Sequence, residues 1–334
     1  MLHDSPPAQQ VGSWYSYLHA GICTQRVITS FFGRGYIMTG ELLLQSLANG
    51  ISLGSLYALI AIGYTMVYGI LRLINFAHAD LLMVSAYGAF YGIMIFALPW
   101  WASFAIAIMI TAFLGVSIEK IAYRPLRNAP RISVLISAIG VSFLLENLGI
   151  VAIGARPKSF PRPEDIVWNI NVGGISFLSL TVIIPVVTIL LLVAVTYMVN
   201  KTKTGTAMRA VSRDFEAASL MAVDVNKVIS TTFVVGSSLA AVGGIMWSLQ
   251  YPQIDPLMGV FPGLKCFIAA VMGGIGNIPG AMLGGFILGM GEVFLVALMP
   301  ELSGYRDAFA FVLLIFILLF KPTGILGENV VEKV

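Results

Sequence analysis

Charge, cysteine and nucleotide-binding motifs are all scarce in this sequence. Only 10% of its 334 residues are Asp, Glu, Lys or Arg. Soluble domains carry about 25%, so an ordinary water-soluble protein is excluded. The two cysteines, Cys23 and Cys266, lie far apart, which excludes a disulfide framework and a cysteine-based metal site. A G-x-x-x-x-G-K-[ST] phosphate-binding loop is also absent, so any ATP must be hydrolysed by another chain.

Apolar residues make up 58% of the chain, and the mean hydropathy is +0.91. These values predict an all-α polytopic membrane protein, because a helix satisfies its own backbone hydrogen bonds in lipid. The 34 glycines suit helices that pack closely in a bilayer. A net charge of +3 is too small to indicate a nucleic-acid partner. The expected surroundings are therefore the lipid bilayer.

The apolar residues fall into runs of about 20 residues or more, the length that a helix needs to cross a bilayer. Two runs are longer than one span requires. In the first of them Asn49-Gly50 predicts a break, and in the other the glycine- and proline-rich stretch 272–280 predicts a second. We expect eight to ten membrane segments, including broken or re-entrant helices. The runs are 42–71, 73–98, 99–118, 132–154, 178–199, 228–250, 263–298 and 305–320.

The basic residues lie in the connections between these runs. The loops 119–131 and 201–227 are rich in Lys and Arg and are therefore expected on the cytoplasmic side, together with the tail 323–334. The connection 155–177 then lies outside. Within it, residues 170–177 alternate around Gly173-Gly174, which predicts a β-hairpin. This hairpin could dock a soluble partner, or it could be an ordinary connection.

Residues 1–40 contain no apolar stretch long enough for a signal peptide or a membrane span. We therefore expect no cleaved signal peptide. Two interpretations remain open: a poorly ordered extension, or a coding sequence that in fact starts at Met38.

The cytoplasmic loop 201–227 predicts a short amphipathic helix over 206–222, capped by Thr204 or Thr206. Arg209, Arg213 and Glu216 flank its apolar stripe. Such a helix is either a contact for a protein outside the membrane or an element that lies in the lipid interface. The stripe consists of Met208, Val211, Phe215, Ala218 and Ala222.

Polar residues inside a membrane domain are candidates for function. Asn75, His78 and Asp80 follow the first apolar run, and they either contact a solute or cap a helix and bond one another. The stretch 273–280 would expose backbone amides and carbonyls, or would serve close helix packing through Gly280-x-x-x-Gly284.

Two further charges lie within apolar runs. Glu146 is expected to face other helices, and Glu292 to reach toward an interface. Neither has the context of a proton relay or a metal site.

Three segments carry a resemblance to one family. GTAMRAVSRDFEAASLMAVDVNKV resembles the "EAA" coupling loop of ABC-importer permeases, specifically that of the branched-chain amino-acid permease family, the LivH-type subunit. INFAHAD at 74–80 and GGIGNIPGAMLGG at 273–285 are similar to two further signatures of the family. Ala79 and Ala222 stand where the family usually has Gly. The resemblance covers about residues 41–322, which it identifies as one transmembrane permease domain of the ABC-importer type.

This resemblance implies a non-catalytic, multi-pass subunit of a bacterial inner-membrane importer. Its partners would be a second permease subunit, two cytoplasmic ATPase subunits that bind the ATP, and an extracytoplasmic binding protein. No cofactor is expected in this chain. The cargo would be branched-chain amino acids, or relatives such as other amino acids, urea or short amides.

The resemblance also implies roles for individual residues. Contact with the ATPase would involve Arg209, Arg213, Phe215, Glu216, Ala217, Ala218 and Ala222. The translocation path would involve Asn75, His78, Asp80, Gly273, Gly274, Gly276, Asn277 and Gly280.

Two other classes of protein were weighed against this one. An ion-coupled secondary transporter needs titratable residues or a cation site at the membrane midplane, and few candidates exist. An intramembrane enzyme needs a Ser/His pair, paired Asp residues or an H-E-x-x-H motif, and the sequence has none of these arrangements. The permease interpretation is therefore preferred.

Overall fold

The computed structural model of this chain describes residues 40–127, 129–172 and 175–327. Residues Glu41–Val334 form one compact unit, and the fold below is that of this unit. The predictions for residues 1–40, including a start at Met38, lie outside the described residues, as does most of the tail 323–334.

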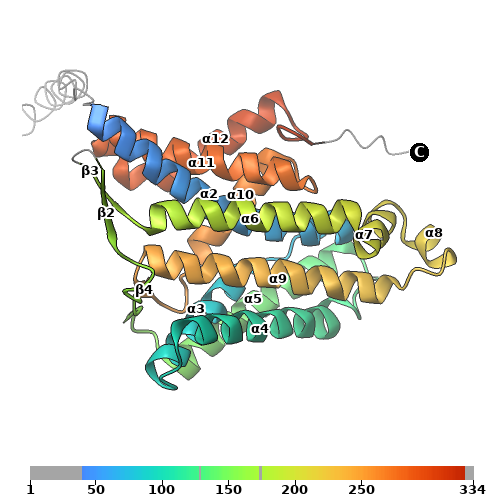
Figure 1. Ribbon diagram of the computed structural model, residues 1–334. Helices are drawn as coiled ribbons and strands as arrows, with labels where there is room; N and C mark the ends of the chain where they lie inside the picture. The colour runs from blue at the N-terminus through green and yellow to red at the C-terminus, as the bar shows by residue number, and fades with distance from the viewer. Residues whose placement is uncertain (1–39, 128, 173–174, 328–334) are drawn as a thin grey trace, which may run out of the picture. The chain divides into compact units, whose positions relative to one another are not determined.

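The unit is built from helices, as its composition predicts (Figure 1). The long helices are α2 (Gly40–Leu71), α3 (His78–Met94), α4 (Trp100–Ile118), α5 (Arg131–Ile153), α6 (Leu180–Lys201), α9 (Val225–Gln250), α10 (Val260–Gly273), α11 (Ile278–Leu298) and α12 (Arg306–Phe320). The short elements are η1 (Glu119–Tyr123), α7 (Lys203–Arg213), α8 (Phe215–Leu220), η2 (Pro300–Tyr305), β1 (Lys158–Ser159), β2 (Asn169–Val172), β3 (Ile175–Leu178) and β4 (Gln253–Ile254).

Seven helical stretches in the described part of the chain are long and apolar enough to cross a membrane. They contain α2, α4, α5, α6, α9, α11 and α12, whereas α3 and α10 are shorter. The all-α polytopic class is confirmed.

Helix α2 lies at the centre of the unit, and 94% of the residues in its most apolar 18-residue stretch are buried. The break predicted at Asn49-Gly50 is wrong, because α2 continues through both residues. Gly50 instead allows close packing, since a Cβ there would lie 3.4 Å from the Met290 Cα of α11. One turn further on, a Cβ at Gly54 would lie 2.9 Å from the Cα of Phe286. The glycine therefore serves helix packing rather than interruption.

Helix α9 packs against α3 and α4 through small residues in the same way. Gly244 leaves no room for a Cβ beside Leu82 and Ser85 of α3, and Gly115 of α4 faces Ser237 of α9. By contrast α5, α6 and α12 are mostly exposed: at most 17% of the residues in the most apolar stretch of each are buried. These three helices, and the side of α4 that carries Met109, Ile110 and Phe113, present apolar side chains on the surface of the unit.

The four strands gather at one end of the unit, called here the strand end (Figure 1). β2 and β3 form the predicted antiparallel hairpin, which is confirmed, and β1 pairs with β4 beyond the end of α9. Arg162 fastens this layer, because its guanidinium donates to the carbonyls of Leu249 and Gln250 at 2.8 and 2.7 Å. These are among the last carbonyls of α9, which have no partner inside the helix.

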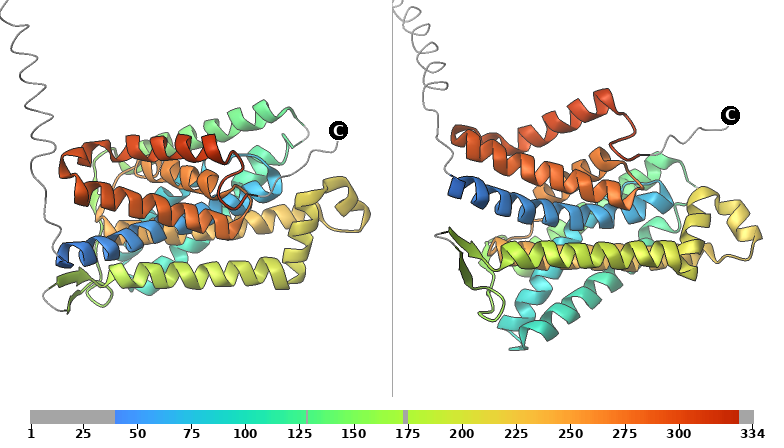
Figure 2. Two further views of the ribbon diagram at one scale, coloured as in Figure 1. Left: turned by 90° about the horizontal axis from the view of Figure 1, so that it is seen from above. Right: turned by 45° about the horizontal axis from the view of Figure 1, so that its top comes forward.

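The opposite end, called here the α8 end, carries α7 and α8 between α6 and α9 (Figures 1 and 2). The end of α2 reaches it, because Arg72 donates to the carbonyl of Ser212 at 3.4 Å. The connection between α10 and α11 also lies near the end of α2, since a Cβ at Gly69 would be 3.4 Å from the Cα of Gly276.

Candidate translocation path and coupling region

Between α2 and α3 the chain is not helical, and this first interruption (residues 72–77) carries polar side chains into the interior. Asn75 is buried, and the Tyr123 hydroxyl donates to its Oδ1 at 2.7 Å. The carbonyl of Asn75 accepts from the backbone of His78 at 3.2 Å and so starts the first turn of α3. Asn75 therefore holds the interruption to η1 as well as to α3.

His78 and Asp80 leave the start of α3 in different surroundings. The His78 ring lies 4.4 Å from the ring of Tyr64, and a Cβ at Gly63 would lie 2.7 Å from its Nε2. The imidazole thus packs against α2 at a place that only glycine leaves open. Asp80 is equally buried but lines a cavity.

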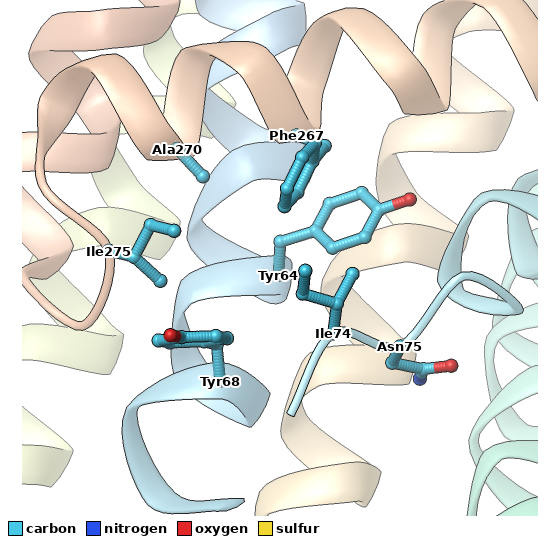
Figure 3. A pocket seen from close by; sticks show the side chains of 7 residues that line it. All are labelled: Tyr64, Tyr68, Ile74, Asn75, Phe267, Ala270 and Ile275. Atoms are coloured by element: carbon cyan, nitrogen blue, oxygen red, sulfur yellow. The ribbon is translucent and has the colours of Figure 1, made fainter. Parts of the chain in front are cut away.

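Two hollows adjoin at this interruption and share Tyr64, Ile74 and Phe267 in their walls. The smaller hollow, about 10 Å³, is drawn in Figure 3 and is completed by Tyr68, Asn75, Ala270 and Ile275. The larger cavity, about 140 Å³, lies between α2, α3, α5 and α10, and its polar lining residues are Tyr64, Asp80, Ser142 and Glu146. The first interruption therefore lines both hollows: Ile74 lies in the wall of each, Asn75 in that of the smaller and Phe76 in that of the larger.

The predicted break after α10 is confirmed, and it forms a second interruption (residues 274–277). Gly274 and Gly276 have φ values of +107° and +96°, which favour glycine. The side chain of Asn277 caps α11 by accepting from the backbone of Gly280 at 3.0 Å.

The second interruption is tied to the segment after α12 rather than opened to a cavity. The backbone N–H groups of Ile325 and Leu326 donate to the carbonyls of Met272 and Gly273 at 2.8 and 3.0 Å. Asn277 donates from Nδ2 to the carbonyl of Leu326 at 2.9 Å. Only Ile275 of this segment reaches a hollow, the smaller one.

The structure therefore separates the predicted path residues into two groups. Asn75 and Asp80 line the adjoining hollows, whereas His78 packs against α2. Gly273 and Gly280 face each other with no room for a Cβ on either, which is close helix packing between α10 and α11. Gly274, Gly276 and Asn277 belong to the turn at the α8 end.

The coupling loop contains two helices, so the single helix predicted over 206–222 is wrong. α7 ends at Arg213, and Asp214 then caps α8 by accepting from the backbone of Glu216 and Ala217 at 2.9 and 3.0 Å. Thr202, not Thr204 or Thr206, caps α7 through the backbone of Gly205. Asp and Thr interrupt helices in this way because their side chains compete for backbone N–H groups.

The predicted apolar stripe is buried over most of its length. Met208, Val211 and Ala218 are buried and Phe215 is half-buried. Ala222 lies beyond the end of α8, is exposed and has a φ of +60°, which glycine adopts more readily. This conformation is a physical reason for a glycine at that position in the family. Ala222 is consequently outside the helix on which it was predicted.

The exposed side of the loop includes two apolar residues that the sequence analysis did not select. Leu220 and Met221 are 86% and 80% exposed, beside Glu216 and Ala217. Adjacent large apolar side chains so exposed at a helix end are candidates for contact with a protein or with the lipid interface. Their position just after the "EAA" residues could have drawn attention to them.

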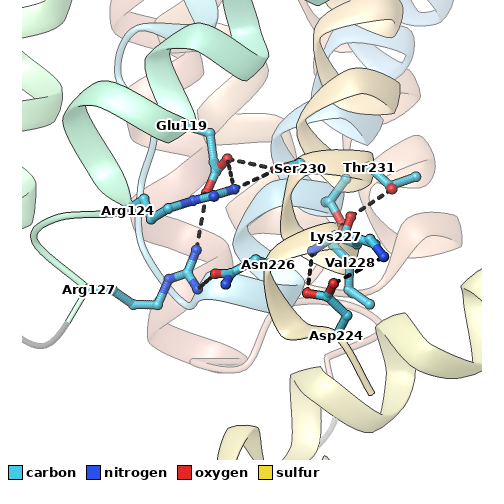
Figure 4. Close-up of polar contacts among 10 residues, drawn as sticks. Glu119, Arg124, Arg127, Asp224, Asn226, Lys227, Val228, Ser230 and Thr231 are labelled. Carbon is cyan, nitrogen blue, oxygen red and sulfur yellow. Dashed lines mark hydrogen bonds and ion pairs between the residues drawn. The ribbon is translucent and has the colours of Figure 1, made fainter. Parts of the chain in front are cut away.

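A polar cluster at the α8 end was also missed (Figure 4). The fully buried Glu119 accepts from Arg124 at 3.0 Å, from Arg127 at 3.1 Å and from Ser230 of α9 at 2.9 Å. Burial lowers the pKa of Arg127, and the charge of Glu119 opposes that effect. Asn226 accepts a further bond from Arg127 at 2.8 Å. The basic loop after α4 is thus bonded to the start of α9.

The cap of α9 adjoins this cluster. Asp224 accepts from the backbone of Lys227 at 3.1 Å, and this hydrogen bond lowers the pKa of the carboxyl. Because Asp224 caps α9 and ends the coupling loop, the loop and α9 are joined at this residue.

Glu292 is buried, so the prediction that it reaches toward an interface is wrong. Its carboxylate pairs with Lys265 of α10 at 3.0 Å and accepts from the Tyr57 hydroxyl at 3.0 Å. Lys265 also pairs with Asp307 of α12 at 2.8 Å. Because Lys265 on the neighbouring helix α10 compensates its charge, the Glu292 carboxylate can be buried without water around it. In the described residues no three His, Cys, Asp or Glu side chains are gathered as ligands for a metal ion.

Comparison with known proteins gives a consistent result. Residues 46–318 match the family described as "Branched-chain amino acid transport system / permease component". The chain is 44% identical over 302 residues to the high-affinity branched-chain amino acid transport system permease protein BraD of Pseudomonas aeruginosa. The aligned region covers 87% of this chain and 98% of the relative.

A second relative, the high-affinity branched-chain amino acid transport system permease protein LivH of Escherichia coli, is 43% identical over 302 residues, or 87% of this chain and 97% of the relative. The probable branched-chain amino acid transport permease protein LivH of Methanocaldococcus jannaschii is 27% identical over 295 residues, covering 85% of this chain and 92% of the relative. No solved structure matches the chain. This chain belongs to the family of permease components of branched-chain amino acid transport systems.

Proposed function

We propose that this chain is the transmembrane permease subunit of a binding-protein-dependent ABC importer, and that it forms the translocation path for branched-chain amino acids or related small polar solutes. The observation that carries the proposal is identity of 43–44% over 302 residues to relatives whose names state that transport. The two adjoining hollows beside Asn75 and Asp80 support it, because a solute in transit needs such a space. The chain itself hydrolyses no ATP.

In this proposal the chain lies in the bacterial inner membrane. The strand end faces the extracytoplasmic side, and the α8 end faces the cytoplasm. The positive-inside rule supports this orientation, since the basic loops 119–131 and 201–227 both lie at the α8 end. Counting α3 and α10 with the seven longer stretches gives nine membrane segments. These two short helices each follow a non-helical segment and meet near their starts, where Gly259 contacts Ala79.

Two cytoplasmic ATPase subunits bind the α8 end in this proposal. Their contact is the exposed side of the loop, formed by Glu216, Ala217, Leu220 and Met221, with Arg209 and Arg213 on α7. Ala218 faces the interior and is therefore a packing residue rather than a contact. An exposed apolar pair beside an acid and two arginines suits a partner that offers an apolar groove with charged edges.

The two other partners are assigned by surface. The second permease subunit would pack on the exposed apolar face of α5, α6 or α12. The binding protein would dock on the strand end, where Trp168 and the hairpin are exposed.

The decisive experiment is uptake by the complete complex in proteoliposomes. Leucine uptake should require ATP inside the vesicles and leucine-loaded binding protein outside. Uptake driven by an ion gradient without ATP would contradict the proposal and favour an ion-coupled secondary transporter.

The ATPase contact is tested by substitution. We expect the double variant Leu220→Asp and Met221→Asp to insert in the membrane but to lose at least about 10-fold of ATPase co-purification, because two apolar contacts are replaced by buried charge. Trp168→Asp at the strand end is the matched control and should retain the ATPases. Equal co-purification with both variants would exclude this contact.

A further inference from the structure

The cavity between α2, α3, α5 and α10 is partly open, because Val260 and Leu264 in its wall are each 38% exposed, and part of its wall is acidic. Its volume is about 140 Å³. One water needs about 10–15 Å³ of such volume. The cavity could therefore contain several waters or one small organic molecule. It adjoins the smaller hollow through Tyr64, Ile74 and Phe267.

The polar part of the wall is acidic. Asp80 of α3 and Glu146 of α5 both line the cavity with the hydroxyl of Ser142 between them in sequence, and none of the lining residues is basic. Asp80 is only 2% exposed, and its Oδ2 has no hydrogen-bond partner among the residues that the structure describes. A buried carboxylate oxygen without a donor loses its solvation without compensation. Ser142 donates a hydrogen bond to the Asp80 carboxyl, and the Oδ2 atom remains open to one further donor from a ligand.

The remaining wall is apolar. Ile74, Phe76, Val260, Leu264 and Phe267 line the same cavity, from the first interruption and from α10. A ligand that satisfies the whole wall would carry a positive hydrogen-bond donor at one end and an aliphatic group at the other.

An inorganic cation suits this wall less well. Hard metal ions such as Ca²⁺ take six to eight oxygen ligands. The cavity offers two carboxylates and the hydroxyls of Ser142 and Tyr64, and no third acidic, His or Cys side chain joins them in the described part of the chain. An alkylammonium group needs only about three acceptors, because it has three N–H donors.

We propose that Asp80 and Glu146 bind the ammonium group of the transported amino acid, with its aliphatic side chain against the apolar wall of this cavity. The proposal rests on the proposed function and adds to it the residues that distinguish an amino acid from an acid or amide of the same shape. Discrimination of this kind follows from buried polar groups that remain unpaired when the wrong ligand is bound. Glu146 belongs to none of the three segments that resemble family signatures.

The test measures equilibrium binding to the purified complex of permease and ATPase subunits, without binding protein. The probes are leucine, 3-methylbutylammonium, which lacks the carboxylate, and 4-methylpentanoate, which lacks the ammonium. Leucine and 3-methylbutylammonium should bind, and 4-methylpentanoate should not. Asp80→Asn and Glu146→Gln should each weaken leucine binding about 10- to 100-fold, the usual effect of losing a charge-assisted hydrogen bond.

Glu164→Gln is the matched control, because Glu164 is an exposed carboxylate in the connection before β2. It should leave binding unchanged. Should Asp80→Asn not fold, Glu146→Gln decides the result, since Glu146 is only half-buried and the change is isosteric. Unchanged leucine binding by Glu146→Gln, or tight binding of 4-methylpentanoate, would overturn the proposal.

Two further arms separate the sources of failure. Replacing Na⁺ and K⁺ by N-methyl-D-glucamine should not alter binding, and a loss of binding in their absence would assign the acids to an inorganic cation instead. Leucine uptake by the wild-type complex is measured in parallel. If the wild type takes up no amino acid, the proposed function fails; if it does and the variants behave like it, only the ammonium site fails.

Discussion

The two interruptions of this chain share an asparagine and differ in their surroundings. In each, the asparagine accepts a hydrogen bond from the backbone at the start of the following helix, Asn75 through its carbonyl before α3 and Asn277 through its side chain before α11. The first interruption lies against two adjoining hollows and is held by Tyr123. The second is bonded to residues 325–326 after α12, and its Gly274 is enclosed by the backbone of residues 326–327.

The difference shows that a helix break marks a solute path only when its neighbours leave space. Non-helical backbone inside a membrane domain needs partners for its polar groups. At the second interruption the C-terminal segment supplies them, whereas at the first the side chains of Asn75 and Tyr123 do so and a cavity remains. We therefore expect changes at the second to affect stability, and changes at the first to affect transport as well.

The largest effect is expected for Gly274→Leu in the second interruption. The new residue would adopt a φ of +107° and its Cβ would lie 2.5 Å from the backbone N of Gly327. Strain of about 1–3 kcal/mol and overpacking of a similar size add together. The amount of folded protein, measured by size-exclusion chromatography of the detergent extract, should fall strongly. Gly140→Leu on the exposed side of α5, where a Cβ meets no atom within 4 Å, is the control. Normal folding of Gly274→Leu would remove the distinction between the two interruptions.

A smaller effect on stability, but a specific one on transport, is expected for Tyr123→Phe. The change leaves the buried Oδ1 of Asn75 without its donor. This costs about 1–3 kcal/mol. Because Asn75 lines the smaller hollow, the initial rate of leucine uptake per folded molecule should fall several-fold. Tyr197→Phe on the exposed side of α6 should match the wild type. An unchanged uptake rate per folded molecule would mean that the first interruption is also only structural.

The smallest effect is expected for Asn277→Ala. It removes the cap of α11 and the bond to Leu326. Loss of a helix cap usually costs about 0.5–2 kcal/mol, so the melting temperature should fall while uptake per folded molecule stays normal. Asn277→Asp keeps the capping oxygen and loses the Nδ2 donor. Its melting temperature should therefore lie between those of Asn277→Ala and the wild type. A transport defect in a stably folded Asn277→Asp protein would place the second interruption on the path.

The sequence predicted what depends on local chemistry. Glycines and a proline predicted the break after α10, and alternation around Gly173-Gly174 predicted the hairpin of β2 and β3. Charge predicted that the loops 119–131 and 201–227 lie together at one end. These features follow from backbone preferences and solvation, which act over a few residues.

What the sequence did not predict depends on contacts between distant segments. Asn49-Gly50 reads as a break until α11 is known to pack on Gly50. Glu292 looks unpaired until Lys265 is placed one helix away. The stripe through Ala218 has helical spacing, but the sequence does not say whether it faces the membrane domain or a partner; in the structure α7 and α8, which carry it, both pack against α9. Leu220 and Met221 are ordinary apolar residues in sequence and become notable only through their exposure.

The central position of α2 has a consequence for biogenesis. α2 leaves the ribosome first among the described helices, yet its tightest partners are in α11, and Tyr57 bonds to Glu292 across 235 residues of sequence. The mean hydropathy of α2 is only 1.6, against 2.8 for α6. Until α11 is synthesised, α2 must therefore stay in the bilayer or at the insertion machinery while the glycines that α11 will cover remain exposed. A nascent chain that ends before Ile278 should therefore be held by insertion chaperones and degraded, whereas one that extends past Leu298 should be released.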